Sequence, residues 1–348
     1  MQSTRQIRVG ILGATGVVGQ RIAALLNGHP HLKLEFLAAS EDRTGTIYHA
    51  GVKDKLFVEP SRLDPFYDKK LEAPFPRPGI DLVFSALSAD AATKYEPLFA
   101  EAGIAVSTNA SAFRMDPLVP VIICDVNPEH LSVLPRQKEA KGWKGFIVAN
   151  SNCSTSGLVT ALAPLMKWGI RSVSVCTYQS LSGAGWPGHP ALAALGNVIP
   201  FIPMEEEKMV EETKKILGGC TSEGFHPASM TVDAACARVP VAEGHLLAAT
   251  VHFEGEPARE EIISAWRAMP SCGLYSAPRH PIVYCDEPDR PQPRLDVGTE
   301  NGMSVIIGRL RRTDSGGWAF FALANNLARG AAGAAVTNGE LLWSRGLV

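Results

Sequence analysis

Short apolar runs alternate with helical stretches along the first third of the chain. The runs are rich in β-branched residues and indicate buried strands. This alternation predicts βαβ units and a parallel sheet covered on both faces, which places ligands beyond the carboxyl ends of its strands. The expected strands are Ile7–Leu12, Leu34–Ala39, Asp81–Ala86 and Ile104–Ser107, and the expected helices include Gly19–Leu26 and Ala91–Glu101.

The pattern changes after about residue 150, where the apolar runs become longer and alternate only in part with polar positions. Such runs predict an open α+β sheet that is antiparallel or mixed. The expected strands of this second sheet are Val173–Gln179, Ala235–Val239, Leu247–Phe253 and Met303–Arg309.

The last segment, Asn325–Leu342, is rich in alanine and predicts a helix that packs closely against a neighbour. We expect it to return to the first domain. The predicted fold is α/β, with a Rossmann-type doubly wound parallel sheet and an α+β catalytic and dimerisation domain built on a mixed sheet. The expected domains are residues 1–150, completed by the helix at 325–348, and residues 151–324.

Composition narrows the class of protein without changing this picture. Of 348 residues, 46% are apolar and 20% charged, which suits two soluble domains with real cores. The formal net charge of -2 gives no electrostatic case for a nucleic-acid or membrane partner. No apolar segment reaches the length of a membrane span.

The cysteines indicate a reduced protein. There are seven, their spacing is irregular, and no CxxC pair occurs. Neither a disulfide framework nor a zinc site is predicted, and we expect no metal. The first expected strand follows the N-terminus without an apolar signal-peptide stretch. We therefore expect a cytoplasmic protein.

A glycine pattern follows the first expected strand directly and opens the first helix. It runs Gly13-Ala-Thr-Gly16-Val-Val-Gly19. One glycine permits a tight turn, another lets the backbone approach a pyrophosphate, and the third lets helix and strand pack closely. The alternative is a simple tight turn, but this context favours a dinucleotide site. Its expected contacts are Gly13, Thr15, Gly16, Val17, Val18 and Gly19.

The end of the second expected strand bears on the choice between NAD and NADP. An NAD site usually offers an acidic residue there to the ribose hydroxyls. This chain continues Ser40-Glu41-Asp42-Arg43-Thr44. A serine hydroxyl and an arginine guanidinium suit a 2′-phosphate. Either acidic residue could instead point inward, and Arg43 could be a solvated loop charge. The pattern favours NADP, bound through Ser40, Arg43 and Thr44.

Cys153 lies in the segment NSNCSTSG, directly before an apolar helical run. A helix N-terminus offers a dipole and free N–H groups, which lower the pKa of a thiol and can hold an oxyanion. This setting favours a nucleophile over a structural cysteine.

A thiolate needs an acid or base partner. His245 stands out among the nine histidines because Arg238 precedes it in RVPVAEGH and a glycine comes directly before it. His252 suits a strand surface. His189 and His226, each followed by proline, suit loops and have no visible partner.

These motifs together carry a resemblance. The chain is similar to the aspartate-semialdehyde dehydrogenases, above all to their fungal and archaeal branch, over almost its whole length. The cysteine motif with the later RVPV…GH motif is highly specific. The matching segments are GATGVVGQ at Gly13–Gln20, SNCST at Ser151–Thr155, SGAGWPG at Ser182–Gly188, NVIPFI at Asn197–Ile202, EEEK at Glu205–Lys208, RVPVAEGH at Arg238–His245 and RGAAGAA at Arg329–Ala335.

The resemblance implies NADPH-dependent reductive dephosphorylation of L-4-aspartyl phosphate to L-aspartate 4-semialdehyde, a step toward lysine, threonine and methionine. Cys153 would form a thioester, His245 would act as acid/base, and Gln179 would orient the acyl group. Arg238 would bind the substrate carboxylate, Glu205 its ammonium, and Lys208 and Arg114 its phosphate. Further contacts implied are Asn152 for the substrate, and Ser88, Ser182, Gly183 and Asn326 for the cofactor.

The charges support these roles independently. Glu205 and Lys208 are three residues apart and project from one helix face, although a surface ion pair would explain such a pair equally well. A substrate with a carboxylate, an ammonium and a phosphate needs several cations and one anion converging on it. Arginine suits the planar carboxylate, and lysine suits the phosphate.

Three departures from the family pattern leave an altered substrate open. They are Leu246-Leu247 after His245, the segment Cys124–Asn127, and Leu323–Asn326, which lacks a histidine. The alternatives are a sister reductase acting on malonyl-CoA or an N-acylated glutamyl phosphate, and a catalytically silent dinucleotide-binding protein. The resemblance also implies a homodimer or homotetramer formed through the second sheet.

Overall fold

The first sheet is parallel throughout. The structure, a computed structural model, describes residues 6–348. Within them the strand order of this sheet is β2-β1-β3-β4-β6-β5, and every neighbouring pair is parallel. The predicted Rossmann-type sheet is confirmed. Its strands are β1 (Ile7–Leu12), β2 (Leu32–Ala38), β3 (Leu82–Ser85), β4 (Ala105–Thr108), β5 (Val121–Ile122) and β6 (Ile147–Asn150).

The hydropathy pattern locates most of this sheet. Strand β1 has the predicted bounds, and the ends of β2, β3 and β4 differ from prediction by one or two residues. Strand ends depend on hydrogen bonding rather than on hydropathy, so small shifts there are expected. The pattern does not predict β5, whose run is only 2 residues long, or β6, which ends at Asn150 beside the cysteine motif.

Helices cover both faces of the first sheet. α1 (Val17–Leu26) and α10 (Gly333–Ser344) share one core with Ile11 of β1. α3 (Ala89–Glu101) shares the opposite core with Leu12 of the same strand. Strands buried on both faces are apolar at successive positions, which explains their continuous runs.

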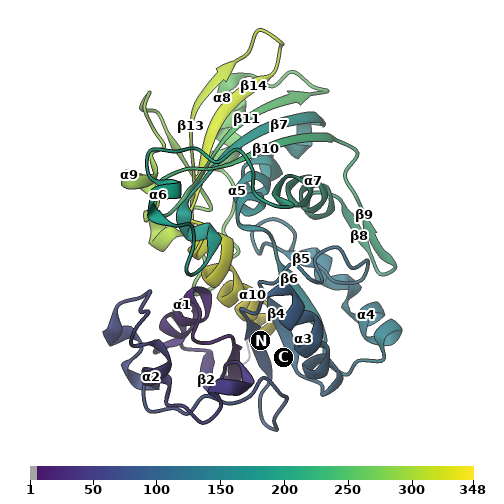
Figure 1. Ribbon diagram of the computed structural model, residues 1–348. Helices are drawn as coiled ribbons and strands as arrows, with labels where there is room; N and C mark the ends of the chain where they lie inside the picture. Colours follow the sequence, from purple (N-terminus) through teal and green to yellow (C-terminus); the bar gives the residue numbers. More distant parts are fainter. Residues whose placement is uncertain (1–5) are drawn as a thin grey trace.

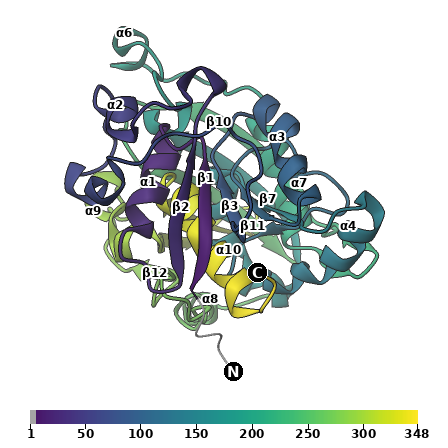
Figure 2. The ribbon, with the colours of Figure 1, turned by 90° about the horizontal axis from the view of Figure 1, so that it is seen from below.

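The C-terminal segment returns to the first sheet, where α10 packs against β3, β4 and β6. Figure 2 shows this yellow helix beside the strands. The helical part begins at Ala328 and not at Asn325, because the Asn325 side chain accepts hydrogen bonds from the N–H groups of Leu327 and Ala328. The domain boundaries at residues 150 and 324 remain our proposal.

The second sheet is mixed, as predicted. Its order is β10-β7-β11-β14-β13-β12. The two outer pairs, β10–β7 and β12–β13, are parallel, and the inner pairs are antiparallel. The pattern does not predict β12 and β14. The strands are β7 (Ile170–Gln179), β10 (Thr231–Arg238), β11 (His245–Phe253), β12 (Ile282–Cys285), β13 (Val305–Arg312) and β14 (Trp318–Ala324).

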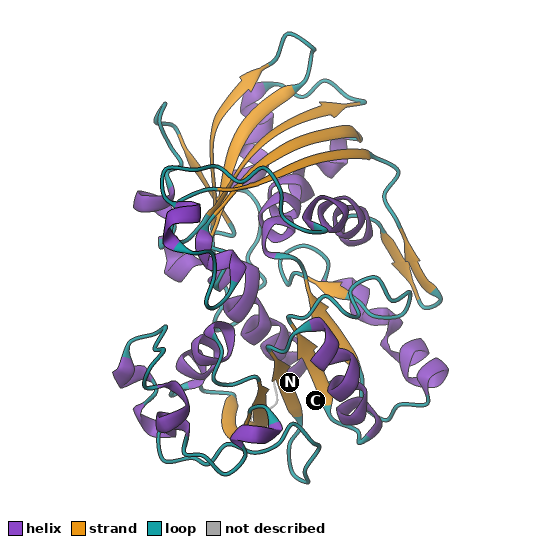
Figure 3. Cartoon of the chain, in the orientation of Figure 1, coloured by secondary structure: helices purple, strands orange, loops and turns teal. Residues whose placement is uncertain are grey.

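One face of the second sheet is covered by helices. α5 (Cys153–Leu162), α7 (Glu205–Ile216) and α8 (Arg259–Arg267) pack there (Figure 3). Alternate residues of β11 are half-buried on the other face. The shorter elements are α2 (Tyr48–Val52), α4 (Leu134–Lys141), α6 (Ala191–Ala194), α9 (Pro293–Asp296) and the hairpin of β8 (Gly219–Thr221) and β9 (Gly224–His226).

The start of α5 connects the two sheets. β6 ends at Asn150 and α5 begins at Cys153. The first turn of α5 therefore lies at the carboxyl edge of the parallel sheet, while its body packs under the mixed sheet (Figure 1). This is the edge at which parallel sheets bind ligands. No helix in residues 6–348 is long and apolar enough to cross a membrane.

Candidate active site

The glycine pattern forms the turn between β1 and α1. Gly13 has a φ of 78°, which favours glycine, and its N–H donates to the Ala38 carbonyl at 3.0 Å. A Cβ on Gly19 would lie 2.3 Å from the Gly13 carbonyl oxygen, so close packing of α1 requires glycine there. A Cβ on Gly16 would meet that oxygen at 3.4 Å, an ordinary contact. Chain packing therefore does not require a glycine at position 16, whereas the close approach of a ligand would.

The N-terminus of α1 suits an anion. The helix begins at Val17, two residues earlier than predicted, and Gly16 at its N-cap offers no side chain to the first turn. N–H groups in a first turn have no partner within the helix and bind phosphate oxygens well. Thr15, which is buried, precedes this turn, and Val18 within it is half-buried. The residues at this position fit a dinucleotide.

The residues expected at the 2′-phosphate lie just beyond β2. Glu41, their acidic neighbour, is engaged elsewhere, because its carboxylate accepts a hydrogen bond from the Tyr95 hydroxyl at 2.6 Å and lies 3.5 Å from Lys94 Nζ of α3. Ser88 caps the same helix, accepting the Ala91 N–H at 3.4 Å. Ser40, Arg43 and Thr44 lie together at this turn, and the side chain of Asp42 beside them is exposed.

Cys153 is the first residue of α5. The preceding residue, Asn152, is the N-cap, and its Oδ1 accepts the N–H groups of Ser154 and Thr155 at 2.9 and 3.1 Å. The structure therefore places the thiol at a helix N-terminus, as predicted. Asn152 also lines the cavity in front of the sulfur.

His245 meets Cys153 from the start of β11. Its Nε2 lies 3.2 Å from the Cys153 sulfur, and the ring is fully buried. The backbone N–H of Ser180 donates to Nδ1 at 3.1 Å. A backbone N–H can only donate, so the neutral ring carries its proton on Nε2 and presents it to the sulfur.

Burial sets the protonation of this pair. It lowers the pKa of His245 to about 3, with a further contribution from the charge of Arg238. Burial and the charge of Glu205 raise the pKa of the Cys153 thiol to about 12, although Arg114, Arg238 and the Ser154 N–H act in the opposite direction. The prediction of a lowered thiol pKa is therefore wrong for this structure, because desolvation outweighs the helix terminus.

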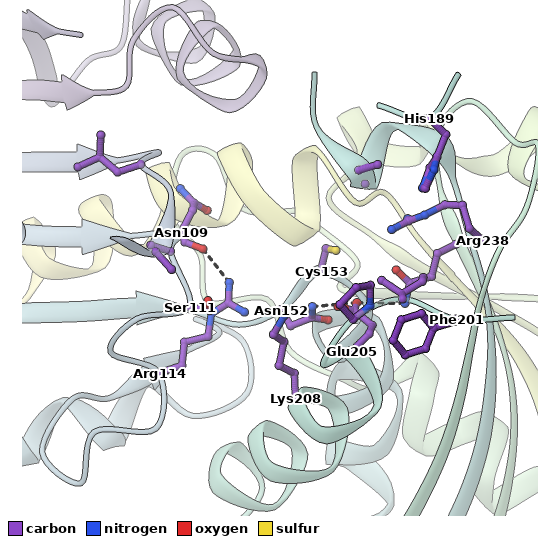
Figure 4. A pocket seen from close by; sticks show the side chains of 18 residues that line it. Asn109, Ser111, Arg114, Asn152, Cys153, His189, Phe201, Glu205, Lys208 and Arg238 are labelled. Carbon is purple, nitrogen blue, oxygen red and sulfur yellow. Dashed lines mark hydrogen bonds between the residues drawn. The ribbon is translucent and has the colours of Figure 1, made fainter. Parts of the chain in front are cut away.

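A cavity of about 490 Å³ opens in front of the sulfur. Three cations and one anion face it, and Figure 4 shows them around Cys153. They come from a loop after β4, from α7 and from the end of β10, segments far apart in the sequence. The four charged side chains predicted to converge do so; they are Arg114, Glu205, Lys208 and Arg238.

Neutral groups hold Glu205 in place. Its Oε1 accepts hydrogen bonds from Asn152 Nδ2 at 2.9 Å, Gln179 Nε2 at 3.0 Å and Ser154 Oγ at 3.3 Å. The side chain is buried, and no cation within residues 6–348 forms an ion pair with it. Its negative charge therefore remains to bind a cationic group of a ligand.

The two arginines differ in their partners. Arg238 is 5% exposed, and its Nη1 donates to the Ser180 carbonyl at 2.8 Å, but it has no carboxylate partner in the described chain. A buried guanidinium without an anion favours an anionic ligand. Arg114 instead forms a 3.0 Å ion pair with Glu212, which the sequence did not indicate.

The loop after β7 and the segment after β14 carry the remaining predicted contacts. Asn326 Nδ2 donates to Ser182 Oγ at 2.9 Å, and Asn326 Oδ1 accepts the N–H of Gly244, the residue before His245. A Cβ on Gly183 would lie 2.7 Å from Arg238 Nη1 and 2.9 Å from His245 Cε1. Glycine at 183 is thus required by the site itself.

Several site residues were missed at the level of sequence. His189, predicted to be a loop residue without a partner, lines the cavity, and Figure 4 shows it on the same side of Cys153 as Arg238. Glu212 could have been found, because it falls on the helix face of Glu205 and Lys208. Nothing in the sequence pattern indicated that Ser180 belongs to the site. Residues 6–348 hold no group of three or more His, Cys, Asp or Glu side chains suited to a metal.

Comparison with known proteins finds relatives along the whole chain. Residues 8–134 match the semialdehyde dehydrogenase NAD binding domain, and residues 162–329 match the semialdehyde dehydrogenase dimerisation domain. An aspartate-semialdehyde dehydrogenase from Archaeoglobus fulgidus is 47% identical over 96% of this chain and 97% of its own. One from Cryptococcus neoformans is 42% identical, with all of both chains covered. The crystal structure of aspartate semialdehyde dehydrogenase with NADP from Candida albicans matches with a TM-score of 0.88 and 36% identity, over 98% of this chain and 100% of that one.

Proposed function

The chain belongs to the aspartate-semialdehyde dehydrogenase family, and we propose that it reduces L-4-aspartyl phosphate to L-aspartate 4-semialdehyde with NADPH, through a thioester on Cys153. One observation carries this proposal. The cysteine–histidine pair, 3.2 Å apart, faces a cavity with three cations and one anion. The substrate bears complementary charges, namely a carboxylate, a phosphate and an ammonium.

The substrate is held by charge-assisted contacts. Arg238 binds the carboxylate, because it is the buried guanidinium without an anion. Glu205 binds the ammonium, and Lys208 and Arg114 bind the phosphate. Gln179 lines the cavity and orients the acyl group, with its amide fixed by Glu205 and by Thr177 Oγ1 at 3.2 Å.

In the first step the Cys153 sulfur attacks the acyl carbon as the thiolate. A C–S bond forms, the C–O bond to phosphate breaks, and phosphate leaves with that electron pair and takes up the proton that the Cys153 thiol has lost, so the step needs no proton from outside. The Nε2–H of His245 stabilises the sulfur anion before the attack. The product is a thioester on Cys153.

In the second step the thioester carbon is reduced. Bound NADPH would supply the hydride, and the residues that would hold it are those of the glycine turn, Ser40, Arg43 and Thr44, and Ser88, Ser182, Gly183 and Asn326. The Nε2–H of His245 donates a hydrogen bond to the oxygen that carries the negative charge. When the C–S bond breaks, the carbonyl re-forms and the sulfur regains its electron pair.

Binding adjusts the acid/base partner. The charge of Arg238 is one of the two causes that lower the pKa of His245. A substrate carboxylate on Arg238 offsets that charge, so the ring becomes easier to protonate when the substrate is bound. In the protonated ring, Nδ1–H can donate a hydrogen bond to Ser180 Oγ, which lies 3.2 Å away.

The known departures from the family pattern lie away from the cavity. None of Leu246, Leu247, Cys124 and Asn325 is among the described residues that line it. Leu247 lies in the core of the second sheet, and Asn325 Nδ2 donates to Glu243 at 2.9 Å. Their positions support an unaltered substrate.

The match to a dimerisation domain supports assembly of several copies. We propose a homodimer or homotetramer formed through the half-exposed face of the second sheet, where alternate residues of β11 have no covering helix. We also propose a cytoplasmic location, because all seven cysteines are free and the chemistry uses a reduced thiol.

The reverse reaction tests the function. The protein is given aspartate semialdehyde, phosphate and NADP, and NADPH formation is followed by its absorbance. Formation that stops when phosphate is omitted supports the proposal. Cys153→Ser should abolish it while NADP binding persists. A protein that instead reduces malonyl-CoA, or that turns over neither substrate, contradicts the proposal.

A further inference from the structure

Four charged residues of α7 form a single stripe. Glu205, Lys208, Glu212 and Lys215 are spaced by three, four and three positions, which places them on one helix face. The first two line the cavity. The other two are buried behind it, with relative exposures of 1% and 4%. Glu212 and Lys215 therefore need a reason for lying in the interior.

Glu212 joins two parts of the site. Its Oε1 accepts a hydrogen bond from Arg114 Nη1 at 3.0 Å, and its Oε2 accepts the backbone N–H of Asn152 at 2.6 Å. Arg114 lines the cavity on one side. Asn152 is the N-cap of the helix that begins with Cys153. One carboxylate thus spans the distance between a cation of the cavity and the backbone beside the nucleophile.

Lys215 holds the backbone that carries Arg114. Its Nζ donates to the carbonyls of Arg114, Asp116 and Val119 at 2.6, 2.8 and 2.8 Å. Together, Glu212 fixes the guanidinium and Lys215 fixes the loop. Both contacts come from α7, the helix that presents Glu205 and Lys208, and the carbonyl of Asn109 adds a further one by accepting a hydrogen bond from Arg114 Nη2 at 2.7 Å.

The spacing between Arg114 and Cys153 therefore depends on Glu212. A carboxylate has an acceptor at each end and satisfies both donors. An amide of the same size has one acceptor and one donor, so one of the two partners would face an N–H group. No other carboxylate in the described chain contacts Arg114.

We propose that Glu212 is a positioning residue, which sets the distance between the phosphate-binding arginine and the nucleophile. This inference rests on the proposed function. It assigns Glu212 no contact with the substrate. Its removal should impair phosphate binding more than it impairs binding of NADP, whose expected pyrophosphate and 2′-phosphate contacts lie beside β1, β2 and α1.

Glu212→Gln is the test, with Glu211→Gln as its matched control, because Glu211 is the exposed neighbour on the same helix. In the reverse reaction, KM for phosphate should rise about tenfold or more in Glu212→Gln, given the strength of a charge-assisted contact. KM for NADP should stay within about twofold. The control should match the wild-type protein. A purely structural role would lower kcat through loss of folded enzyme and leave KM for phosphate unchanged.

A second measurement needs no turnover. Phosphate should protect Cys153 of the wild-type protein against iodoacetamide, and protection should need about ten times more phosphate in Glu212→Gln. Glu212→Asp keeps the charge and serves if the glutamine variant does not fold; it should show a smaller rise. Unchanged phosphate requirements in both folded variants would overturn the proposal. Failure of the proposed function would look different: the wild-type protein would show no activity, although phosphate would still protect its Cys153 thiol.

Discussion

The sulfur of Cys153 and Nε2 of His245 lie 3.2 Å apart, and the opposite ring nitrogen is occupied by the Ser180 N–H. The ring thus approaches the sulfur as a donor. Because burial disfavours both the thiolate and the imidazolium, the resting pair is neutral. The thiolate nucleophile therefore forms when the thiol loses its proton. It is not already present in a thiolate–imidazolium ion pair.

The reactivity of Cys153 should therefore rise with pH over a wide range. With a thiol pKa near 12, the thiolate fraction increases about tenfold per pH unit throughout the range below it. Alkylation by iodoacetamide, followed by mass spectrometry of the peptide that contains Cys153, should accelerate from pH 7 to pH 10 without levelling. A plateau below pH 8 would show an ion pair and contradict this account.

The buried ring of His245 should make the fold sensitive to acid. Its pKa falls from 6.5 to about 3 on folding, so between these values the unfolded chain binds the extra proton. Stability is then lost as the pH falls from 6.5 toward 3, by on the order of 1.4 kcal/mol per pH unit from this group.

Urea unfolding of the wild-type protein and of His245→Asn at pH 7.5, 5.5 and 4.5 measures that loss. The wild-type protein should lose stability more steeply than the variant across this series. If the wild-type protein and the variant lost stability equally as the pH falls, the pKa of His245 would not be lowered by folding.

Arg238 should act on the substrate carboxylate in particular. Arg238→Lys keeps a charge but loses the planar pair of donors, and kcat/KM for aspartate semialdehyde should fall about 10- to 100-fold. The measurement is repeated with an aldehyde that lacks the carboxylate. That substrate should be affected much less, and an equal loss on both would place Arg238 elsewhere in the mechanism.

Arg43 should select NADP. Arg43→Ala removes a charged donor from the expected 2′-phosphate site, and kcat/KM with NADP should fall about tenfold or more, while the value with NAD changes little. Asp42→Ala provides the control at the neighbouring exposed position. Equal losses with both cofactors would indicate that Arg43 supports the loop instead.

Local patterns were enough to predict much of the fold. Strand β1 is bounded as its apolar run indicates, and the glycine turn after it follows from a left-handed Gly13 and a Gly19 that no side chain can replace. Helix spacing likewise placed Glu205 and Lys208 on one face. Each of these depends on neighbours a few positions away, which a sequence displays directly.

Tertiary structure decided which of these residues meet in the site and how their pKa values shift. Arg114 and Glu212 are 98 positions apart, and Cys153 and His245 are 92 apart, so no periodicity relates them. The pKa of the Cys153 thiol is raised and not lowered as predicted, because the surrounding cores exclude water. Excluding water raises the energy of a thiolate, and this effect depends on the whole fold more than on the neighbouring residue. The sequence by itself determined which groups are present and how each segment winds. Only folding decided which groups meet and which of them carry a proton.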